Sequence, residues 1–139
     1  MTWFLSITGR VKDQFKTDKA KFIAPAPIEL RLSANADLDQ VCVVGNGLPQ
    51  PIALVTLSAV AKGKPPQLVE NELQKTIEET NKTLEKHEHI QAAVILKDNW
   101  TIENGLLTPS MKIKRNGVEK LFQPKYADWV KVHKPVVWE

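Results

Sequence analysis

The sequence predicts an α+β fold, in which a small mixed sheet of about three strands is packed by helices and preceded by an N-terminal β-hairpin. Three short apolar runs, at residues 41–44, 52–60 and 92–96, predict the strands of the sheet. Residues 68–84 form the longest helical pattern, because leucine and isoleucine recur on one face and charged residues occupy the other.

The first 24 residues predict a hairpin followed by a basic loop. Residues 3–8 alternate in strand fashion, Gly9 ends that strand, and residues 11–17 indicate its antiparallel partner. The loop at residues 18–21 carries two lysines. We expect this hairpin to be loosely attached to a compact α+β body formed by residues 25–139.

The body is expected to begin with a short helix and a pair of strands. Pro25 and Pro27 suit the first turn of a helix, which we expect to end by Asn35. Residues 37–40 predict a polar turn. The Gly-Asn-Gly sequence at residues 45–47 is typical of a tight turn, so the first two strands of the sheet are expected to pair antiparallel.

The second half of the body is predicted to contain a long helix, a third strand and a final helix. Residues 62–66 indicate a Gly/Pro linker before the long helix, and residues 100–102 are expected to extend the third strand. The final helix is predicted at residues 118–132. Its apolar positions are Val118, Leu121, Phe122 and Trp129.

Composition limits the classes of function that fit this chain of 139 residues. Apolar residues make up 42% and charged residues 25%, which indicates a single globular domain. The single cysteine, Cys42, lies in an apolar run and predicts a buried structural thiol. His87 and His89 have no neighbouring cysteine, so we expect no metal site in this chain. Neither a membrane-spanning run nor a signal-peptide pattern is visible, which favours a cytoplasmic protein.

Positive charge is concentrated near the two ends of the chain. Residues 1–25 carry a net charge of +3 and residues 107–134 a net charge of +5, whereas residues 26–106 carry −4. This distribution suits a phosphate-bearing ligand or partner. Nucleic acid is not expected, because no helix-turn-helix, zinc-finger or RNA-binding motif is present.

Residues 106–115 read LLTPSMKIKR and combine a Pro-marked loop with three basic side chains. Period-2 alternation places Lys112 on the face opposite its apolar neighbours. A lysine on a short anchored loop suits the neutralisation of phosphate charge, although short basic runs are also common as solvated turns. The residues expected to anchor this loop by burial are Leu106, Leu107, Met111 and Ile113.

A second segment, residues 7–29, reads ITGRVKDQFKTDKAKFIAPAPIE. In this order and at this spacing, the two segments resemble the C-terminal subdomain of the adenylate-forming (AMP-binding) acyl-CoA synthetases, in the long-chain fatty acid–CoA ligase branch. The corresponding family patterns are GRxKDxFKTxxGKxxAPxxIE and LTPxxKxKR. The resemblance covers nearly the whole chain and implies an isolated C-terminal subdomain, with the large N-terminal ATP- and acyl-binding domain absent.

The resemblance implies an acid–thiol ligase reaction in two halves. The carboxylate of a fatty or other carboxylic acid attacks the α-phosphate of ATP, and coenzyme A (CoA) then displaces AMP from the acyl-adenylate. Magnesium is expected with ATP in the full-length enzyme. The subdomain moves between two poses against the N-terminal adenylation domain and is inactive by itself. The expected partners are that domain, ATP, CoA and the acid, with peripheral membrane association of the full enzyme as a further expectation.

Three positions acquire a role through the resemblance. Lys112 matches the adenylation lysine, whose ammonium group stabilises the charge that builds on the α-phosphate. Lys12 falls at the hinge position, and Arg10 matches a residue that reaches the ribose hydroxyls of the nucleotide. From the residues alone, an ion pair between Arg10 and Asp13 is an equal alternative. Lys114 and Arg115 receive no catalytic role.

The loop that contains Lys19, Ala20 and Lys21 matches the CoA-facing segment of the family. The family pattern has glycine where this chain has Ala20, and glycine permits a positive φ that alanine disfavours. This departure puts the contact with CoA in doubt, since it could weaken the second half-reaction or alter the thiol acceptor.

Two hypotheses from other classes also fit the sequence. The chain could be a non-catalytic basic binding module that docks an acidic partner, or a regulatory subunit that completes a separately encoded adenylation domain. A complete small protein that happens to begin at this point is a third alternative.

Overall fold

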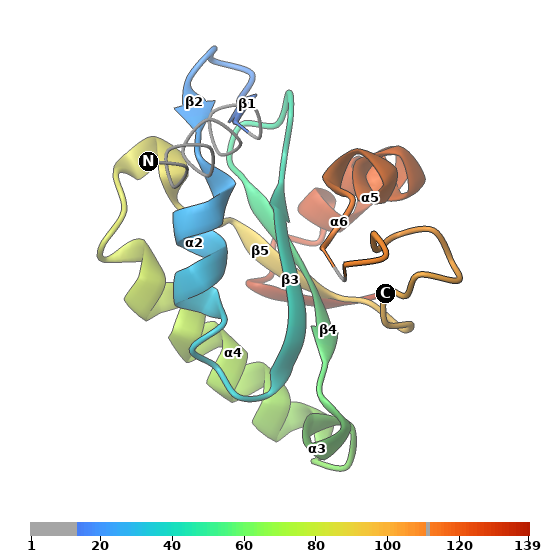
Figure 1. Cartoon of the computed structure of the whole chain (residues 1–139). Helices are drawn as coiled ribbons and strands as arrows, with labels where there is room; N and C mark the ends of the chain where they lie inside the picture. The colour runs from blue at the N-terminus through green and yellow to red at the C-terminus, as the bar shows by residue number, and fades with distance from the viewer. Residues whose placement is uncertain (1–13, 111) are drawn as a thin grey trace, which may run out of the picture.

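The computed structural model describes residues 14–110 and 112–139, which form a two-stranded hairpin and a four-stranded sheet (Figure 1). In the larger sheet the strand order is β3–β4–β5–β6, with β3 and β4 antiparallel and the other two pairs parallel. The predicted α+β class and mixed sheet are confirmed. The strands are β1 (Phe15–Lys16), β2 (Phe22–Ile23), β3 (Leu38–Val44), β4 (Ile52–Leu57), β5 (Ala92–Ile95) and β6 (Val136–Trp138).

Helices cover both faces of this sheet. Helices α2 and α4 lie on one face, and α5 and α6 lie on the other (Figure 1). The sheet is therefore the middle of three layers. The helices are α2 (Pro25–Leu32), α3 (Ala59–Lys62), α4 (Pro66–Asn81), α5 (Arg115–Phe122) and α6 (Tyr126–Lys131), with short 3₁₀ turns η1 (Lys86–Glu88) and η2 (Gln123–Lys125).

Alternation along the strands divides the core into two halves. In β3, Val41 and Val43 face α2 and α4, whereas Cys42 and Val44 face α5 and α6. Every residue of β4 and β5 is buried, because both faces of these inner strands are covered by helices. Cys42 has no exposed surface, so the predicted buried thiol is confirmed.

Proline and serine define where several helices begin. Pro25 and Pro66 occupy first-turn positions of α2 and α4, where a missing N–H costs no hydrogen bond. Ser58 accepts a hydrogen bond from the Ala61 amide and caps α3, so β4 ends at Leu57 and does not continue to residue 60 as predicted. The predicted linker at residues 62–66 accordingly starts with the last residue of α3.

The predicted turn at residues 37–40 is wrong, because β3 already begins at Leu38. The side-chain amide of Gln40 bridges to the neighbouring segment: its Nε2 donates to the Trp100 carbonyl at 2.8 Å, and its Oε1 accepts from the Trp100 amide at 2.7 Å. These bonds hold Trp100 beside β3. The predicted extension of the third strand over residues 100–102 is therefore wrong as well, and this segment leads into a turn.

The predicted final helix at residues 118–132 is divided into α5, η2 and α6. Pro124 lies in η2, where it cannot donate a backbone hydrogen bond to a continuing helix. Val118, Phe122 and Trp129 are buried as expected, but Leu121 is 55% exposed. Strand β6, which follows this region and pairs with β5, was not predicted, because a run of three residues carries too little periodicity.

The predicted hairpin between residues 3–8 and 11–17 lies mostly outside the described residues. The described hairpin pairs Phe15 with Ile23 and Lys16 with Phe22 around the basic loop. Phe15 and Ile23 are both buried in the core shared with α2 and α4. The apolar side of the described hairpin is therefore continuous with the body, whereas loose attachment of the hairpin expected at residues 3–17 stays a prediction.

Candidate functional site

The loop that carries Lys112 is closed by backbone pairing. Leu107 and Ile113 form an antiparallel bridge, and the Lys114 amide donates to the Leu106 carbonyl at 2.9 Å. Within the loop, the Thr108 amide donates to the Lys112 carbonyl at 2.8 Å, and the Lys112 amide donates to Thr108 Oγ1 at 3.0 Å. The backbone of Lys112 is therefore held from both sides.

Burial separates the anchoring residues from the lysines of this loop. Leu106 and Leu107 are buried and Ile113 is half-buried, whereas Lys112 and Lys114 are exposed. The predicted anchoring is confirmed for these three apolar residues, while Met111 lies outside the described residues. Lys112 is thus presented to solvent on a loop whose apolar side is embedded in the layer of α5 and α6.

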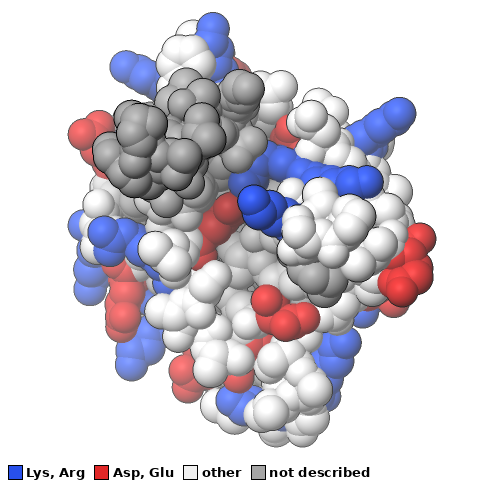
Figure 2. Space-filling view, in the orientation of Figure 1, with Lys and Arg blue, Asp and Glu red and all other residues white. Residues whose placement is uncertain are grey.

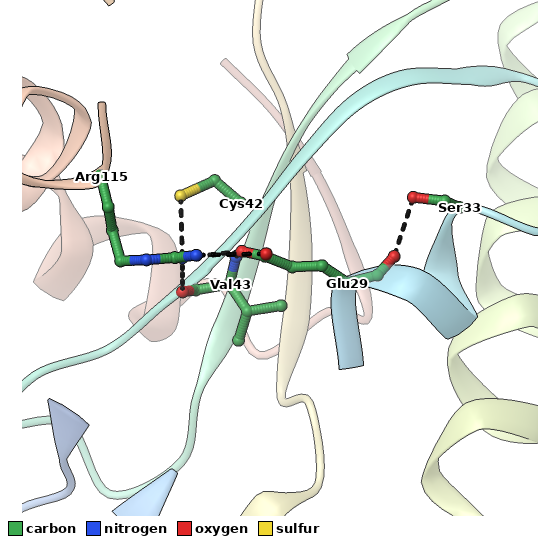
Figure 3. A network of polar contacts seen from close by, with 5 residues as sticks. All are labelled: Glu29, Ser33, Cys42, Val43 and Arg115. Carbon is green, nitrogen blue, oxygen red and sulfur yellow. Dashed lines mark hydrogen bonds and ion pairs between the residues drawn. The ribbon is translucent and has the colours of Figure 1, made fainter. Parts of the chain in front are cut away.

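Arg115 follows the loop and connects it to the other side of the sheet. Its Nη1 lies 2.7 Å from Glu29 Oε2 and its Nη2 lies 3.1 Å from Glu29 Oε1, which makes the ion pair bidentate. Nη1 also donates to the Val43 carbonyl at 2.9 Å and lies 3.3 Å from Cys42 Sγ. Figure 3 shows this side chain extending across β3 towards α2.

Glu29 completes the cluster from α2. Its Oε2 accepts a hydrogen bond from the Val43 amide at 2.7 Å, so Glu29 and Arg115 together take up the N–H and the C=O of the same residue. Because β3 is the outer strand of the described sheet, these backbone groups are not used by a neighbouring strand. Glu29 and Arg115 are 86 positions apart in the chain. They are the last residues of the two segments, 7–29 and 106–115, that resemble the family patterns. The sequence did not single out this contact.

The second candidate loop connects β1 to β2 at the tip of the hairpin. The Thr17 amide donates to the Lys21 carbonyl at 2.9 Å, and the Ala20 amide donates to the Thr17 carbonyl at 3.0 Å. Two further backbone bonds attach the hairpin to the turn after β3, from Asp18 to Leu48 and from Gly47 to Lys16. Figure 2 shows basic side chains projecting from this tip at the top of the view, and Lys19 and Lys21 are both exposed.

Ala20 adopts a backbone conformation with a φ of 61°. The chain therefore keeps the left-handed conformation that the glycine of the family pattern would favour, despite the added methyl group. A non-glycine residue in this region costs about 1–2 kcal/mol. The departure from the family pattern stores strain in this loop without changing the handedness of its backbone.

A surface cavity of about 340 Å³ adjoins this loop. Its basic lining comes from Lys19 and Lys21 on the hairpin and from Lys86 and His87 of η1. No sequence pattern connects Lys86 and His87 with the basic loop, because the two segments are far apart in the chain. The fold alone brings them to one cavity, and the three lysines gathered there suit an anionic ligand.

The remaining predictions concern Arg10, Lys12, metal binding and membrane spans. Arg10 and Lys12 lie outside the described residues. Within residues 14–110 and 112–139, no group of three or more histidine, cysteine or carboxylate side chains is arranged to bind a metal ion. In the same part of the chain, no helix has both the length and the apolar character that crossing a bilayer requires.

Several solved structures share this fold. The A-PCP didomain of carboxylic acid reductase from Segniliparus rugosus, in complex with AMP, superimposes with a TM-score of 0.72 at 21% identity and covers 86% of this chain and 17% of that one. The adenylation domain of a carboxylate reductase from Mycobacterium chelonae gives a TM-score of 0.72 at 20% identity, covering 86% and 19%. At these identities the likeness shows the fold alone.

Sequence comparison then identifies the family. Residues 12–129 match the model of the AMP-binding enzyme C-terminal domain, and the chain belongs to this family. Long-chain-fatty-acid–CoA ligase FadD15 of Mycobacterium tuberculosis is 31% identical over 137 aligned residues, which cover 86% of this chain and 23% of the relative. Long-chain-fatty-acid–CoA ligase 5 of Mus musculus is 33% identical, covering 86% and 20%. This chain thus spans about a fifth of the length of these relatives.

Proposed function

We propose that this chain is the mobile C-terminal part of an ATP-dependent acyl-CoA synthetase and supplies the lysine that promotes acyl-adenylate formation. The observation that carries the proposal is the exposed Lys112 on a loop whose backbone is fixed by the Leu107–Ile113 bridge and by Thr108. A lysine held in this way can be presented to a phosphate without a large loss of backbone freedom.

In the first half-reaction, the carboxylate of the acid attacks the α-phosphate of ATP and pyrophosphate leaves. Negative charge increases on the α-phosphate oxygens as the new bond forms, and the ammonium group of Lys112 stabilises that charge. Magnesium would accompany ATP in the full-length enzyme, where it would offset part of the phosphate charge. Arg10 is proposed to contact the ribose of the same nucleotide.

In the second half-reaction, the thiol of CoA attacks the acyl carbonyl and AMP leaves. The loop with Lys19, Ala20 and Lys21 is proposed to face CoA, and the basic cavity beside it suits the phosphates of that substrate. Rotation about Lys12 exchanges the two faces between the halves. The names of the relatives support a long-chain fatty acid as substrate. A cytoplasmic location and peripheral membrane association of the full enzyme are part of the same proposal.

The test uses an enzyme in which this chain forms the C-terminal part, with each half-reaction assayed separately. Lys112→Ala is expected to lower acyl-adenylate formation about 100- to 1,000-fold, while thioester formation from supplied acyl-adenylate stays near the wild-type rate. Lys114→Ala is the matched control, because Lys114 is exposed two residues further along and receives no role.

Three results would contradict the proposal. Equal losses in both half-reactions would make Lys112 a structural residue. Wild-type adenylation by Lys112→Ala would remove its catalytic role. ATP–pyrophosphate exchange by the 139-residue chain alone would show that no N-terminal adenylation domain is needed.

A further inference from the structure

We propose that Arg115 is a positioning residue for Lys112, and that it acts by clamping the lysine loop to β3 and α2 through Glu29. The inference rests on the proposed function of Lys112. It adds a role for two residues that contact neither ATP nor CoA in that mechanism. The physical basis is the bidentate ion pair that joins the two motif segments.

The geometry of the pair favours a fixed orientation. Both nitrogens at the end of the guanidinium group contact both oxygens of one carboxylate, at 2.7 and 3.1 Å. The two side chains are only 18% and 17% exposed, so solvent screens the pair less than it screens a surface ion pair. A planar fork that contacts both oxygens restricts rotation, which a lysine ammonium group cannot do.

The Arg115–Glu29 ion pair, which we call the clamp, is attached to the sheet. Arg115 donates to the Val43 carbonyl, and Glu29 accepts from the Val43 amide. Val43 itself is paired with Ala53 in the inner strand β4, which is buried along its whole length. A displacement of Arg115 relative to the sheet would therefore break several hydrogen bonds at once.

Few bonds separate the clamp from Lys112. Arg115 is the first residue of α5 and lies three positions after Lys112. The intervening residues are held as well, because Ile113 pairs with Leu107 and the Lys114 amide donates to Leu106. The entry to the loop is fixed by burial of Leu106 and Leu107, whereas its exit is fixed by Arg115.

A catalytic ammonium group must be placed accurately to stabilise the negative charge that builds on the reacting phosphate. A shift of about 1 Å can lower a rate by about 100-fold. If the clamp sets the position of Lys112, its loss affects the half-reaction that uses Lys112 and spares the other. A merely structural pair would affect both halves in parallel with stability.

The experiment compares four variants in an enzyme that contains this chain as its C-terminal part. Arg115→Met is expected to lower the kcat of adenylation at least tenfold, to leave the KM for ATP within about twofold, and to spare thioester formation from supplied acyl-adenylate. Arg115→Lys is expected to recover only part of the rate, because it keeps the charge and loses the fork. Lys125→Met is the control. It removes a cation whose Nζ lies 3.4 Å from Glu139 Oε2, in an ion pair outside the Lys112 loop. The fourth variant combines two substitutions.

A double variant separates positioning from stability. Arg115→Met leaves the Glu29 carboxylate without its cation and lowers the thermal midpoint, whereas Arg115→Met with Glu29→Gln removes both charges and is expected to recover much of that midpoint. Adenylation should stay low in the double variant. Recovery of adenylation together with stability, equal loss in both half-reactions, or full adenylation by folded Arg115→Met each overturns the positioning role.

The proposed function and the clamp fail in different ways. Wild-type adenylation by Lys112→Ala overturns both. A large loss in Lys112→Ala with none in Arg115→Met overturns the clamp alone.

Discussion

The two lysine-bearing loops are held by different kinds of interaction. The loop with Lys112 is closed by a strand-like bridge and tied to the sheet by the Arg115–Glu29 ion pair. The loop with Lys19 and Lys21 is attached by backbone hydrogen bonds and contains Ala20 in a left-handed conformation. Both present exposed lysines, but the first is supported by a half-buried ion pair and the second carries local strain.

This difference suits the two proposed roles. A lysine that stabilises a transition state must be placed accurately, so strong support of its backbone is useful. A loop that lines a cavity for a large anionic substrate requires less accuracy, because several cations share the charge. We therefore expect perturbation of the ion pair to matter for stability and for one half-reaction, and relaxation of Ala20 to matter little for adenylation.

The largest expected effect on stability comes from Glu29→Ala. The change removes the carboxylate of the half-buried bidentate ion pair with Arg115 and the acceptor of the Val43 amide, so we expect the free energy of unfolding to fall by about 3 kcal/mol. Urea denaturation measures this loss. Glu78→Ala, at an exposed helical glutamate of α4, is the matched control and is expected to change stability by less than about 0.5 kcal/mol. Equal effects of the two changes would mean that the ion pair contributes nothing to the fold.

A second prediction concerns the hinge. Lys12→Pro fixes φ near −65° and removes an amide donor, so we expect the second half-reaction to fall at least tenfold while the first stays close to the wild-type rate. Lys12→Ala removes the side chain and leaves the backbone free, so it should retain both rates. Single-turnover assays of each half-reaction, with thermal unfolding measured beside them, test this. Wild-type rates in a folded Lys12→Pro enzyme would place the pivot elsewhere.

Ala20→Gly is expected to have a smaller and opposite effect. Glycine adopts a φ of 61° without the clash of a methyl group, so the free energy of unfolding should rise by about 1 kcal/mol. Adenylation should not change. Ala34→Gly, at an exposed alanine without a positive φ, is the control and should lower stability by about 0.5–1 kcal/mol. A loss of stability in both variants would show that Ala20 carries no strain.

The smallest effect is expected at Tyr126, in the layer that supports the Lys112 loop. Burial first, and then the negative charge of Glu119, raise the pKa of Tyr126 above its ordinary value. The folded protein therefore holds the phenol proton more tightly than the unfolded chain. The resulting contribution to the free energy of unfolding is complete below about pH 10 and is lost progressively as the pH rises above that value.

Tyr126→Phe should remove this alkaline dependence. The substitution removes one hydroxyl and keeps the ring, so we expect the free energy of unfolding to change by less than about 1 kcal/mol at neutral pH. Urea midpoints of the wild-type protein and of Tyr126→Phe, compared near pH 8 and near pH 11, measure how stability changes with pH in each. Because the chain has a single tyrosine, its phenolate absorbance reports the titration directly. Titration of folded protein near pH 10 would contradict the raised pKa.

Local pattern was sufficient for much of the fold. Pro25 predicted the start of α2, because a missing amide is tolerated in the first turn of a helix. Apolar runs indicated β4 and β5, because strands covered on both faces need continuous apolar residues. Pro66 was assigned to a linker, although it is the first residue of α4. Alternation around Ile113 correctly separated a half-buried isoleucine from the exposed Lys112. These features depend on neighbouring residues, so one segment of sequence contains the necessary information.

Tertiary structure decided the features that depend on distant partners. Gln40 entered β3 because its side-chain amide bonds to Trp100, and β6 formed because β5 offered an edge to three residues near the end of the chain. Lys86 reached the cavity of Lys19 and Lys21 only through folding. The clamp between Glu29 and Arg115 spans 86 positions. No periodicity or composition predicts which carboxylate a given arginine meets, because that choice is made by the packing of whole elements against the sheet.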